Sequence, residues 1–283
     1  MVFDWNFHIA CNYRCPYCFF NDHWKDLEKL NSLPALDVLQ RAWGRIHEDL
    51  GECYVTFNGG EPTAVPRFAE LMGALSRWHR WNFNTNLSWT IPQWQRFAER
   101  TDASRGSVQF SYHPTEDQDF AGFLRRALFV QGLGFRNCSV CVVAYPPQLA
   151  ALRRFCAELK DGGLVARIQP MVGTFQGRRY PGAYTAGEKA LIDELNQETR
   201  SVLTPEMGYA VGDQSPRGRP CHAGQFYCHI NQSGDVYRCT QVPQRQEAKL
   251  GNLYEGFQLR ADPQPCPMDF CPCGESRWLA EDP

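Results

Sequence analysis

Three cysteines stand close together near the start of the chain, with the spacing Cys11-x3-Cys15-x2-Cys18. Zinc sites usually take four ligands from two separated pairs. Three thiolates in one short loop instead suit an iron–sulfur cube, whose fourth iron would stay open for a small molecule. The alternative is a distant fourth protein ligand, which would complete a zinc site or an ordinary electron-transfer cluster.

A second group of residues with chemical potential is Asn58-Gly59-Gly60-Glu61-Pro62, directly after the apolar run 54–57. Asn-Gly between two apolar runs is typical of a hairpin, but the apolar residues that follow recur at helical spacing. The two glycines would let backbone approach a ligand closely, and Glu61 offers a carboxylate that accepts hydrogen bonds.

Together these two motifs resemble those of the radical S-adenosylmethionine (SAM) superfamily, over roughly residues 1–200. The cysteine motif, with Tyr17 before its last cysteine, follows a first strand, and a GGEP motif follows the second. The resemblance implies that a [4Fe–4S] cluster with one open iron chelates the amino and carboxylate groups of SAM. It further implies reductive cleavage to a 5′-deoxyadenosyl radical, which abstracts hydrogen from a substrate, with flavodoxin or ferredoxin as the external reductant.

The same resemblance suggests which residues contact SAM. Tyr17 would pack near the adenine and Glu61 would accept from the SAM ammonium. Polar residues that end the third and fourth strands are candidate ribose or carboxylate contacts, although such residues are often turn or cap groups. The predicted cofactor-binding residues are Tyr17, Gly59, Gly60, Glu61, Pro62, Thr85, Asn86, Ser111 and Arg125. His113, Gln169 and Arg126 are weaker candidates; an arginine would meet the SAM carboxylate, or lie on a solvated helix face.

Six further cysteines lie at the other end of the chain: Cys221, Cys228, Cys239, Cys266, Cys271 and Cys273. Cys221-x12-Gly234-x4-Cys239 resembles the opening of the auxiliary-cluster extensions called SPASM and, in shortened form, twitch domains. The C-x4-C-x-C ending departs from the full SPASM pattern, so we expect one auxiliary [4Fe–4S] cluster. Cys221 and Cys239 are the first candidate ligands of this cluster, and Cys271 and Cys273 are the next. Cys228 and Cys266 compete with them, because six thiols are present for four ligand places. A structural zinc knuckle is the alternative, and His222 and His229 are not expected to ligate.

The remaining four cysteines are expected to be structural. Cys53 and Cys156 should be small buried hydrophobes. Cys138 and Cys141 form a C-x2-C pair, but positions three apart in a strand face opposite sides of a sheet.

Hydrophobic periodicity predicts six strand-then-helix units that would position these motifs. Strands are expected near 3–9, 54–57, 81–86, 107–112, 138–145 and 164–169, and helices near 36–50, 68–75, 92–100, 118–132, 148–160 and 186–200. Thr185 and Glu188 form a capping box for the last helix. The fold class is therefore α/β, a partial (β/α)6 TIM-like barrel, in which both motifs fall at the carboxyl ends of the strands. A small cysteine-rich, twitch-like domain with a β-hairpin at 229–230 and 236–237 follows.

Three segments are expected: a radical SAM barrel at 1–203, a Pro- and Gly-rich linker at 204–220, and the auxiliary-cluster domain at 221–283.

The 283 residues carry a formal net charge of -2 and a pI of about 6.4, which argues against a nucleic-acid partner held by bulk charge. No long apolar run or signal peptide is seen, so a cytoplasmic protein is expected. Because the first strand starts at once, no leader-binding domain is expected to precede it.

The sequence thus predicts a radical SAM oxidoreductase, or a peptide- or natural-product-modifying enzyme. Its substrate would be a small molecule or peptide that is oxidised, crosslinked or epimerised, with the auxiliary cluster as electron relay. The alternatives are a non-catalytic iron–sulfur electron-transfer protein, for which Glu61 and its glycines would have no purpose, and a zinc-stabilised binding module.

Overall fold

The structure is a computed structural model that describes residues 1–18, 20, 24–29, 31, 33–136, 138–198, 207–242, 248–271 and 275–280. The six strands of the barrel are β1 (Val2–His8), β2 (Tyr54–Gly59), β3 (Arg80–Thr85), β4 (Gly106–Tyr112), β5 (Ser139–Ala144) and β6 (Val165–Pro170). The helices are α1 (Trp24–Glu28), α2 (Leu36–Leu50), α3 (Phe68–Leu75), α4 (Ile91–Arg100), α5 (Phe120–Gly132), α6 (Leu152–Asp161), α7 (Ala186–Glu198) and α8 (Met207–Ala210).

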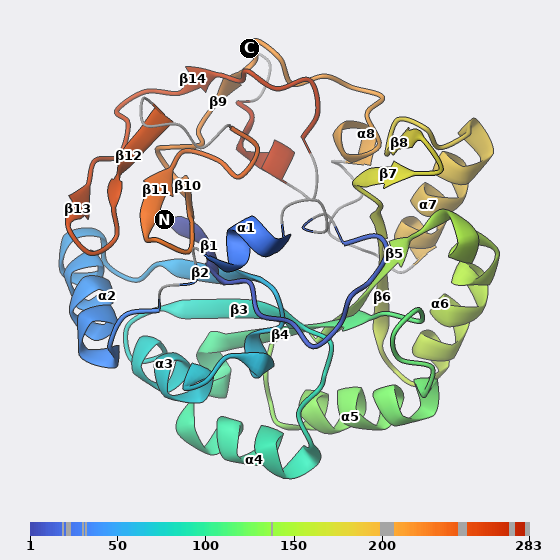
Figure 1. Cartoon of the computed structure of the whole chain (residues 1–283), viewed down its shortest axis with the longest axis horizontal. Coiled ribbons are helices and arrows are strands. Elements are labelled where there is room, and N and C mark those ends of the chain that lie inside the picture. Colours follow the sequence, from blue (N-terminus) through green and yellow to red (C-terminus); the bar gives the residue numbers. More distant parts are fainter. Residues whose placement is uncertain are drawn as a thin grey trace.

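Strands β1 to β6 pair in sequence order, each parallel to the next. Helices α2 to α7 surround the sheet on its outer side, and α1 lies on its inner side (Figure 1). The α/β class and the partial barrel of six strand-then-helix units are confirmed. A parallel sheet of this kind brings the loops that follow its strands to one rim.

The alternation of side chains along β1 explains why one face of the sheet meets the helices. Phe3, Trp5 and Phe7 are at most 1% exposed. Trp5 lies 5.5 Å from Trp43 of α2, measured between ring centroids, and Phe7 lies 5.5 Å from Phe68 of α3. The polar residues between them therefore point to the inner face of the sheet.

Side chains at the start and near the end of α7 fix this helix at the last strand of the barrel. The predicted capping box at the start of α7 is confirmed, since the Thr185 N–H donates to Glu188 and the Glu188 N–H donates to the Thr185 hydroxyl. Further along α7, Asn196 is fully buried beside β6. Its Oδ1 accepts from the Ile168 N–H and its Nδ2 donates to the Ile168 carbonyl, both at 2.9 Å. The amide thus occupies the hydrogen-bonding edge that a further strand would use.

The C-terminal part contains β9 (Pro220–Cys221), β10 (Tyr227–Ile230), β11 (Asp235–Tyr237), β12 (Lys249–Asn252), β13 (Gly256–Phe257) and β14 (Gln264–Pro265). The predicted hairpin is confirmed, because His229 pairs with Tyr237 and Ile230 with Val236. Strand β10 also pairs in parallel with β1, so one sheet of ten strands runs from β13 to β6. The predicted start of a separate segment at 221 is therefore not a boundary of the sheet.

Several short elements were not predicted. Strands β7 (Gly173–Phe175) and β8 (Arg178–Tyr180) form a small hairpin at the rim after β6. Such three-residue strands carry too few side chains to show a periodic pattern. None of the described helices has the length and apolar character needed to cross a bilayer.

Candidate functional site

The first cysteine motif lies in the loop that leaves the carboxyl end of β1. Cys15 is 7% exposed, and Cys11 and Cys18 are partly exposed. A turn closes the loop, since the Cys18 N–H donates to the Cys15 carbonyl at 3.0 Å. Burial raises the pKa of all three thiols, that of Cys15 to about 12, and neighbouring thiols raise the pKa of Cys11 and Cys15 further. The thiols are therefore close enough to interact, and iron binding must displace their protons.

The Gly-Gly pair allows the ends of β1 and β2 to approach each other. Gly59 has a φ of +132°, and a Cβ on Gly60 would lie 2.1 Å from the Ala10 carbonyl oxygen. Backbone hydrogen bonds cross this contact, from Gly60 N–H to His8 O (3.0 Å) and from Glu61 N–H to Ala10 O (2.7 Å). This changes the expected role of the glycines: the close approach is to the backbone that leads into the cysteine loop.

Glu61 is the buried centre of the rim, with 3% exposure. Its Oε1 accepts from Thr63 N–H, from the Thr63 hydroxyl and from the Thr85 hydroxyl, at 3.0, 2.6 and 2.7 Å. Its Oε2 accepts from Asn86 N–H at 2.7 Å. Burial raises the pKa of the carboxyl group, and these donors oppose the rise. Because a carboxylate oxygen has two lone pairs, Oε2 can still accept from a ligand.

Thr85 and Asn86 therefore serve first to hold Glu61, and Asn86 also reaches the cysteine loop. The Asn86 side chain donates to the Asn12 Oδ1 at 2.9 Å, and Asn12 donates to the Ser88 hydroxyl at 2.8 Å. Pro62 is buried at the start of a short 3-10 helix whose first residues Glu61 caps. Asn12 was not identified from the sequence, although its place between two cysteines marks it as a candidate.

Aromatic residues line the rim on the side of β4 and β5. The Tyr17 hydroxyl lies 3.0 Å from Nδ1 of His113, and the two rings stack at 5.9 Å. Tyr17 also contacts Tyr145, at 5.0 Å between ring centroids. Burial lowers the pKa of His113 to about 4, so its imidazole is neutral at ordinary pH. His113 thus positions Tyr17 in the cysteine loop.

The remaining predicted SAM contacts differ in where they lie. Arg125 is exposed on α5. Arg126, the next residue, pairs with Asp117 at 3.1 Å and keeps a buried Nε without a partner. Burial, aided by Asp117 and opposed by Arg126, raises the pKa of Tyr13 to about 12, which places Arg126 beside the cysteine loop. Of the two arginines, Arg126 is thus the one that lies near Tyr13 of the cysteine loop. Ser111 and Gln169 are partly exposed on the inner faces of their strands.

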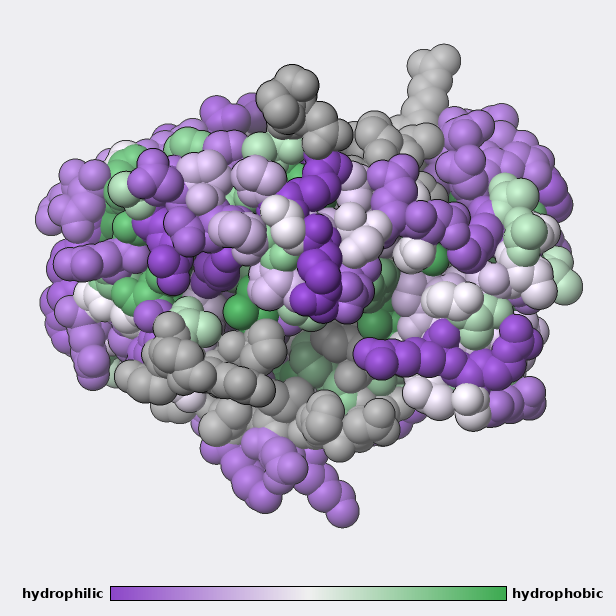
Figure 2. Space-filling view, turned by 90° about the horizontal axis from the view of Figure 1, so that it is seen from above, coloured by the Kyte–Doolittle hydropathy of each residue, from purple (hydrophilic) through white to green (hydrophobic). Residues whose placement is uncertain are grey.

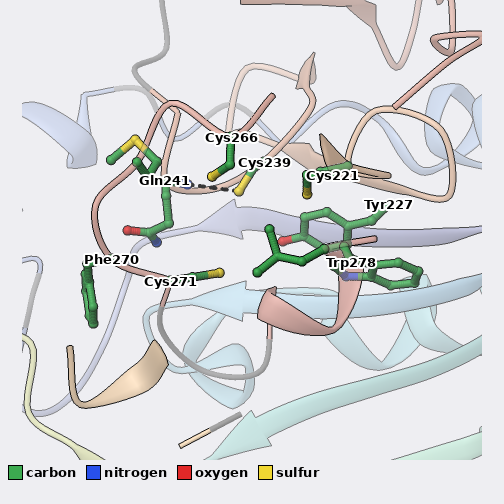
Figure 3. A pocket seen from close by; sticks show the side chains of 11 residues that line it. Cys221, Tyr227, Cys239, Gln241, Cys266, Phe270, Cys271 and Trp278 are labelled. Atoms are coloured by element: carbon green, nitrogen blue, oxygen red, sulfur yellow. Dashed lines mark hydrogen bonds between the residues drawn. The ribbon is translucent and has the colours of Figure 1, made fainter. Parts of the chain in front are cut away.

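Four of the C-terminal cysteines line one pocket. They are Cys221, Cys239, Cys266 and Cys271, and Tyr227, Phe270 and Trp278 form apolar walls around them (Figure 3). The Cys239 sulfur accepts from the Gln241 N–H at 3.5 Å. Burial raises the pKa of Cys221, and the nearby Arg238 guanidinium opposes the rise. The pocket is thus a place where several thiols meet a positive charge.

The other predicted ligand candidates do not line this pocket. Cys228 is fully buried on the opposite face of β10, in the core between sheet and helices, and burial raises its pKa to about 12. Strand alternation explains this, because the adjacent Tyr227 takes the pocket face. Cys273 lies outside the described residues. His229 is buried and lies 3.2 Å from Asp4, whereas His222 contacts Gln225 at 2.8 Å.

Two of the four middle cysteines, Cys53 and Cys156, are buried as expected. Cys53 is 2% and Cys156 is 6% exposed within the core. Cys138 precedes β5 and Cys141 lies within it, both partly exposed.

The donor sets of both cysteine groups fit iron–sulfur clusters. In the part of the chain that the structure describes, no three thiol, imidazole or carboxylate groups converge as the ligands of a single metal ion do. A [4Fe–4S] cluster binds each thiolate on a different iron, so its ligands need not converge. Soft thiolates are the ligands that such clusters take.

Several known proteins are similar to this chain. Mycofactocin maturase MftC of Mycobacterium ulcerans is 25% identical over 253 residues, which cover 83% of this chain and 67% of the relative. MftC of Mycobacterium tuberculosis is 25% identical over 254 residues, and the match spans 63% of its length. Among solved structures, anSMEcpe with bound AdoMet and Cp18Cys peptide has a TM-score of 0.61 at 17% identity, covering 90% of this chain and 78% of that one. Streptococcus suis SuiB has a TM-score of 0.61 at 14% identity, covering 90% and 63%.

The family model described as the radical SAM superfamily matches residues 5–112. These residues contain the cysteine loop, the Gly-Gly-Glu-Pro motif and strands β1 to β4, the elements that form the rim. The match thus places both motifs within a segment that is similar to the radical SAM superfamily, and the fold of the chain is similar to the folds of anSMEcpe and SuiB.

Proposed function

We propose that this enzyme cleaves SAM reductively at the rim of its barrel and abstracts hydrogen from a peptide. Cys11, Cys15 and Cys18 would hold the SAM-binding cluster. When that cluster and SAM are bound, they supply a 5′-deoxyadenosyl radical. The observation that carries the proposal is the pair of backbone bonds that fixes Glu61 beside the cysteine loop, because it holds a hydrogen-bond acceptor next to a thiol trio.

The residues around the loop would bind and orient SAM. Glu61 Oε2 would accept from the ammonium group, and Arg126 would pair with the carboxylate of the same molecule. Tyr17, held by His113, would pack near the adenine, and Ser111 would meet the ribose. Thr85 and Asn86 would keep the Glu61 carboxylate in one orientation, so that binding requires little rearrangement.

The C-terminal pocket would hold one auxiliary [4Fe–4S] cluster that relays electrons. We propose Cys221, Cys239, Cys266 and Cys271 as its ligands, because all four line the same pocket. In this proposal residues 221–283 form a twitch-like unit that shares its sheet with the barrel, with 204–220 as the connection. Cys273 stays a candidate ligand.

A peptide substrate is favoured by the similar proteins. SuiB has been solved bound to precursor peptide SuiA, and anSMEcpe bound to a Cp18Cys peptide. Both share the fold that surrounds the rim of this chain. The reaction on the peptide would be an oxidation, a crosslink or an epimerisation.

The test is anaerobic reconstitution followed by dithionite and SAM. We expect about eight irons per chain and formation of 5′-deoxyadenosine. Cys11→Ala, Cys15→Ala and Cys18→Ala should each abolish 5′-deoxyadenosine formation, whereas Cys53→Ala, at a buried position outside the site, should retain it. Cleavage by a Cys15→Ala protein would contradict the proposal. Iron without cleavage would indicate an electron-transfer protein, and bound zinc a binding module.

A further inference from the structure

Two polar residues stand side by side on the inner face of β6. Ala166 and Ile168 are at most 1% exposed and pack in the core beneath the helices. Arg167 and Gln169 alternate with them and must face the other way. Both are partly exposed, so solvent or a ligand can reach them from the inside of the barrel.

Each side chain has one buried polar atom that the described residues leave unpaired, although the Gln169 Nε2 donates to the Pro170 carbonyl at 3.5 Å. The Nε of Arg167 and the Oε1 of Gln169 are buried atoms without a hydrogen-bond partner, and no described carboxylate pairs with Arg167. A guanidinium group stays charged at any ordinary pH. The charge of Arg167 has no counter-charge on the part of the protein that the structure describes, and a buried donor without a partner, such as its Nε, calls for an explanation such as a bound ligand.

The strand register places Arg167 in line with inner-face residues of the neighbouring strands. Arg167 pairs with Cys141 of β5, and Cys141 pairs with Ser111 of β4. Ser111 is one of the proposed SAM contacts. Arg167 is therefore two strands away from a proposed SAM contact on the same face of the sheet.

We propose that Arg167 binds a carboxylate of the substrate, with Gln169 accepting a hydrogen bond from a neighbouring N–H of the same molecule. Arginine binds carboxylates through two parallel hydrogen bonds. The ligand class is thus an acylated amino acid or peptide with a free carboxylate next to an amide. This inference rests on the proposed function and names a substrate feature.

SAM also carries a carboxylate, but its position argues for the substrate. The ammonium and carboxylate of SAM share one carbon atom, and the proposed function places the ammonium at Glu61, after β2. Arg167 lies on β6, four strands further along the sheet. The proposed function already assigns the SAM carboxylate to Arg126, so the carboxylate left for Arg167 is one on the substrate.

The experiment compares Arg167→Gln and Arg167→Lys with Arg154→Gln, an exposed arginine on α6. The reconstituted enzyme with SAM is titrated with N-acetyl-phenylalanine, N-acetyl-phenylalaninamide and N-acetyl-aspartic acid α-amide, whose side-chain carboxylate is free, and binding is followed by saturation-transfer NMR. We expect wild type to bind one or both carboxylate probes at least tenfold more tightly than the neutral amide. Arg167→Gln should lose this preference, Arg167→Lys should retain part of it, and Arg154→Gln should match wild type. The two carboxylate probes distinguish a terminal from a side-chain source.

SAM affinity, measured on the same proteins without probe, shows whether Arg167 binds the carboxylate of the substrate or that of SAM. It should stay within twofold of wild type in Arg167→Gln, which also shows that the variant is folded. A tenfold loss of SAM affinity would overturn the assignment to the substrate. Equal binding of acid and amide by wild type, or binding of neither, would overturn it as well. Absence of 5′-deoxyadenosine from wild type would instead contradict the proposed function and leave the carboxylate preference measurable.

Discussion

Single residues at the rim hold the Glu61 carboxylate beside the cysteine loop. Glu61 takes four hydrogen bonds from three residues that belong to two different loops. Bonds to an ionised acceptor are stronger than those between neutral groups. The carboxylate therefore stabilises the rim as well as offering a lone pair to a ligand.

Glu61→Gln should weaken both the stability of the rim and the binding of SAM. The amide replaces one acceptor oxygen by a donor, which then faces the hydroxyl or N–H donors that Glu61 now satisfies. We expect a loss of about 3 kcal/mol in the free energy of unfolding, measured by urea denaturation of the reduced apoprotein. 5′-Deoxyadenosine formation by the reconstituted variant should fall at least tenfold. Unchanged stability would mean that the carboxylate does not organise these loops.

Gly60 shows why a glycine stands next to Glu61. In Gly60→Ala the new Cβ would lie within 2.1 to 2.4 Å of the carbonyl oxygens of Ile9 and Ala10, so the backbone before the cysteine loop must move. We expect a destabilisation of about 2 kcal/mol or more, in line with other strained or overpacked sites, and a lower iron content. Gly187→Ala is the matched control, because nothing lies within 4 Å of its Cβ; it should be neutral or slightly stabilising. Equal behaviour of the two variants would refute this interpretation of Gly60.

At the scale of elements, the sequence predicted most of the barrel because its strands alternate and its helices repeat strongly. The apolar positions of α2, for example, recur as Leu39, Ala42, Trp43 and Ile46, all buried. The spacing of Cys11, Cys15 and Cys18 located the loop. The partners of the polar residues could not be predicted, since hydrogen bonds such as that between Asn86 and Asn12 join residues 74 positions apart.

The edge of β6 depends on one buried amide. In Asn196→Ala the N–H and carbonyl of Ile168 would both lose their partner within the core. Each buried group left unsatisfied costs about 1–3 kcal/mol, so the free energy of unfolding should fall by about 2–4 kcal/mol in a urea titration. Gln197→Ala, at an exposed neighbouring position on α7, should change it by less than about 0.5 kcal/mol. A loss no larger than that of the control would mean that the edge is held by other contacts.

His79 connects α2 to β2 and gives the stability of the barrel a pH dependence. Its Nδ1 accepts from the Cys53 N–H at 3.1 Å and its Nε2 donates to the Trp43 carbonyl at 3.0 Å. Burial lowers the pKa of this fully buried imidazole below 6.5. As the pH falls below 6.5, the unfolded chain binds a proton that the folded chain does not, so stability present above pH 6.5 is lost. The loss is about 1.4 kcal/mol per pH unit until the folded pKa is reached.

His79→Gln should therefore be less stable than wild type at pH 7.5, but it should lose less on acidification. Between pH 7.5 and 5.5 we expect wild type to lose about 1 kcal/mol more than the variant, measured by urea denaturation at both pH values. All other titrating groups are common to the two proteins, so the difference isolates His79. Parallel pH dependence of the two proteins would show that its pKa is the same in the folded and unfolded chain.

At the scale of the whole molecule, the two cysteine groups belong to one continuous sheet. Strand β10 pairs with β1, and the contact between the buried His229 and the partly exposed Asp4 lies across that pairing. The hairpin signal in the sequence predicted which strands pair locally. It could not predict that the hairpin adds to the first strand of the barrel, because that contact joins residues more than 220 positions apart. Figure 2 shows a largely hydrophilic face with hydrophobic residues in a hollow near its middle.

Two nearby cysteines of the C-terminal part differ in their expected roles: Cys239 is a proposed cluster ligand, whereas Cys228 belongs to the core. Cys239 lines the pocket with three other thiols, whereas Cys228 is fully buried on the opposite face of β10. Cys239→Ala should lower the iron content from about eight to about four per chain and spare 5′-deoxyadenosine formation more than formation of the final product. Cys228→Ala should keep about eight irons and lose only stability, by about 1–2 kcal/mol for one deleted buried group. If Cys228→Ala lost four irons and Cys239→Ala none, the pocket would not be the auxiliary site. If Cys239→Ala lost 5′-deoxyadenosine formation and formation of the final product equally, the C-terminal strands would be needed for the barrel itself to fold.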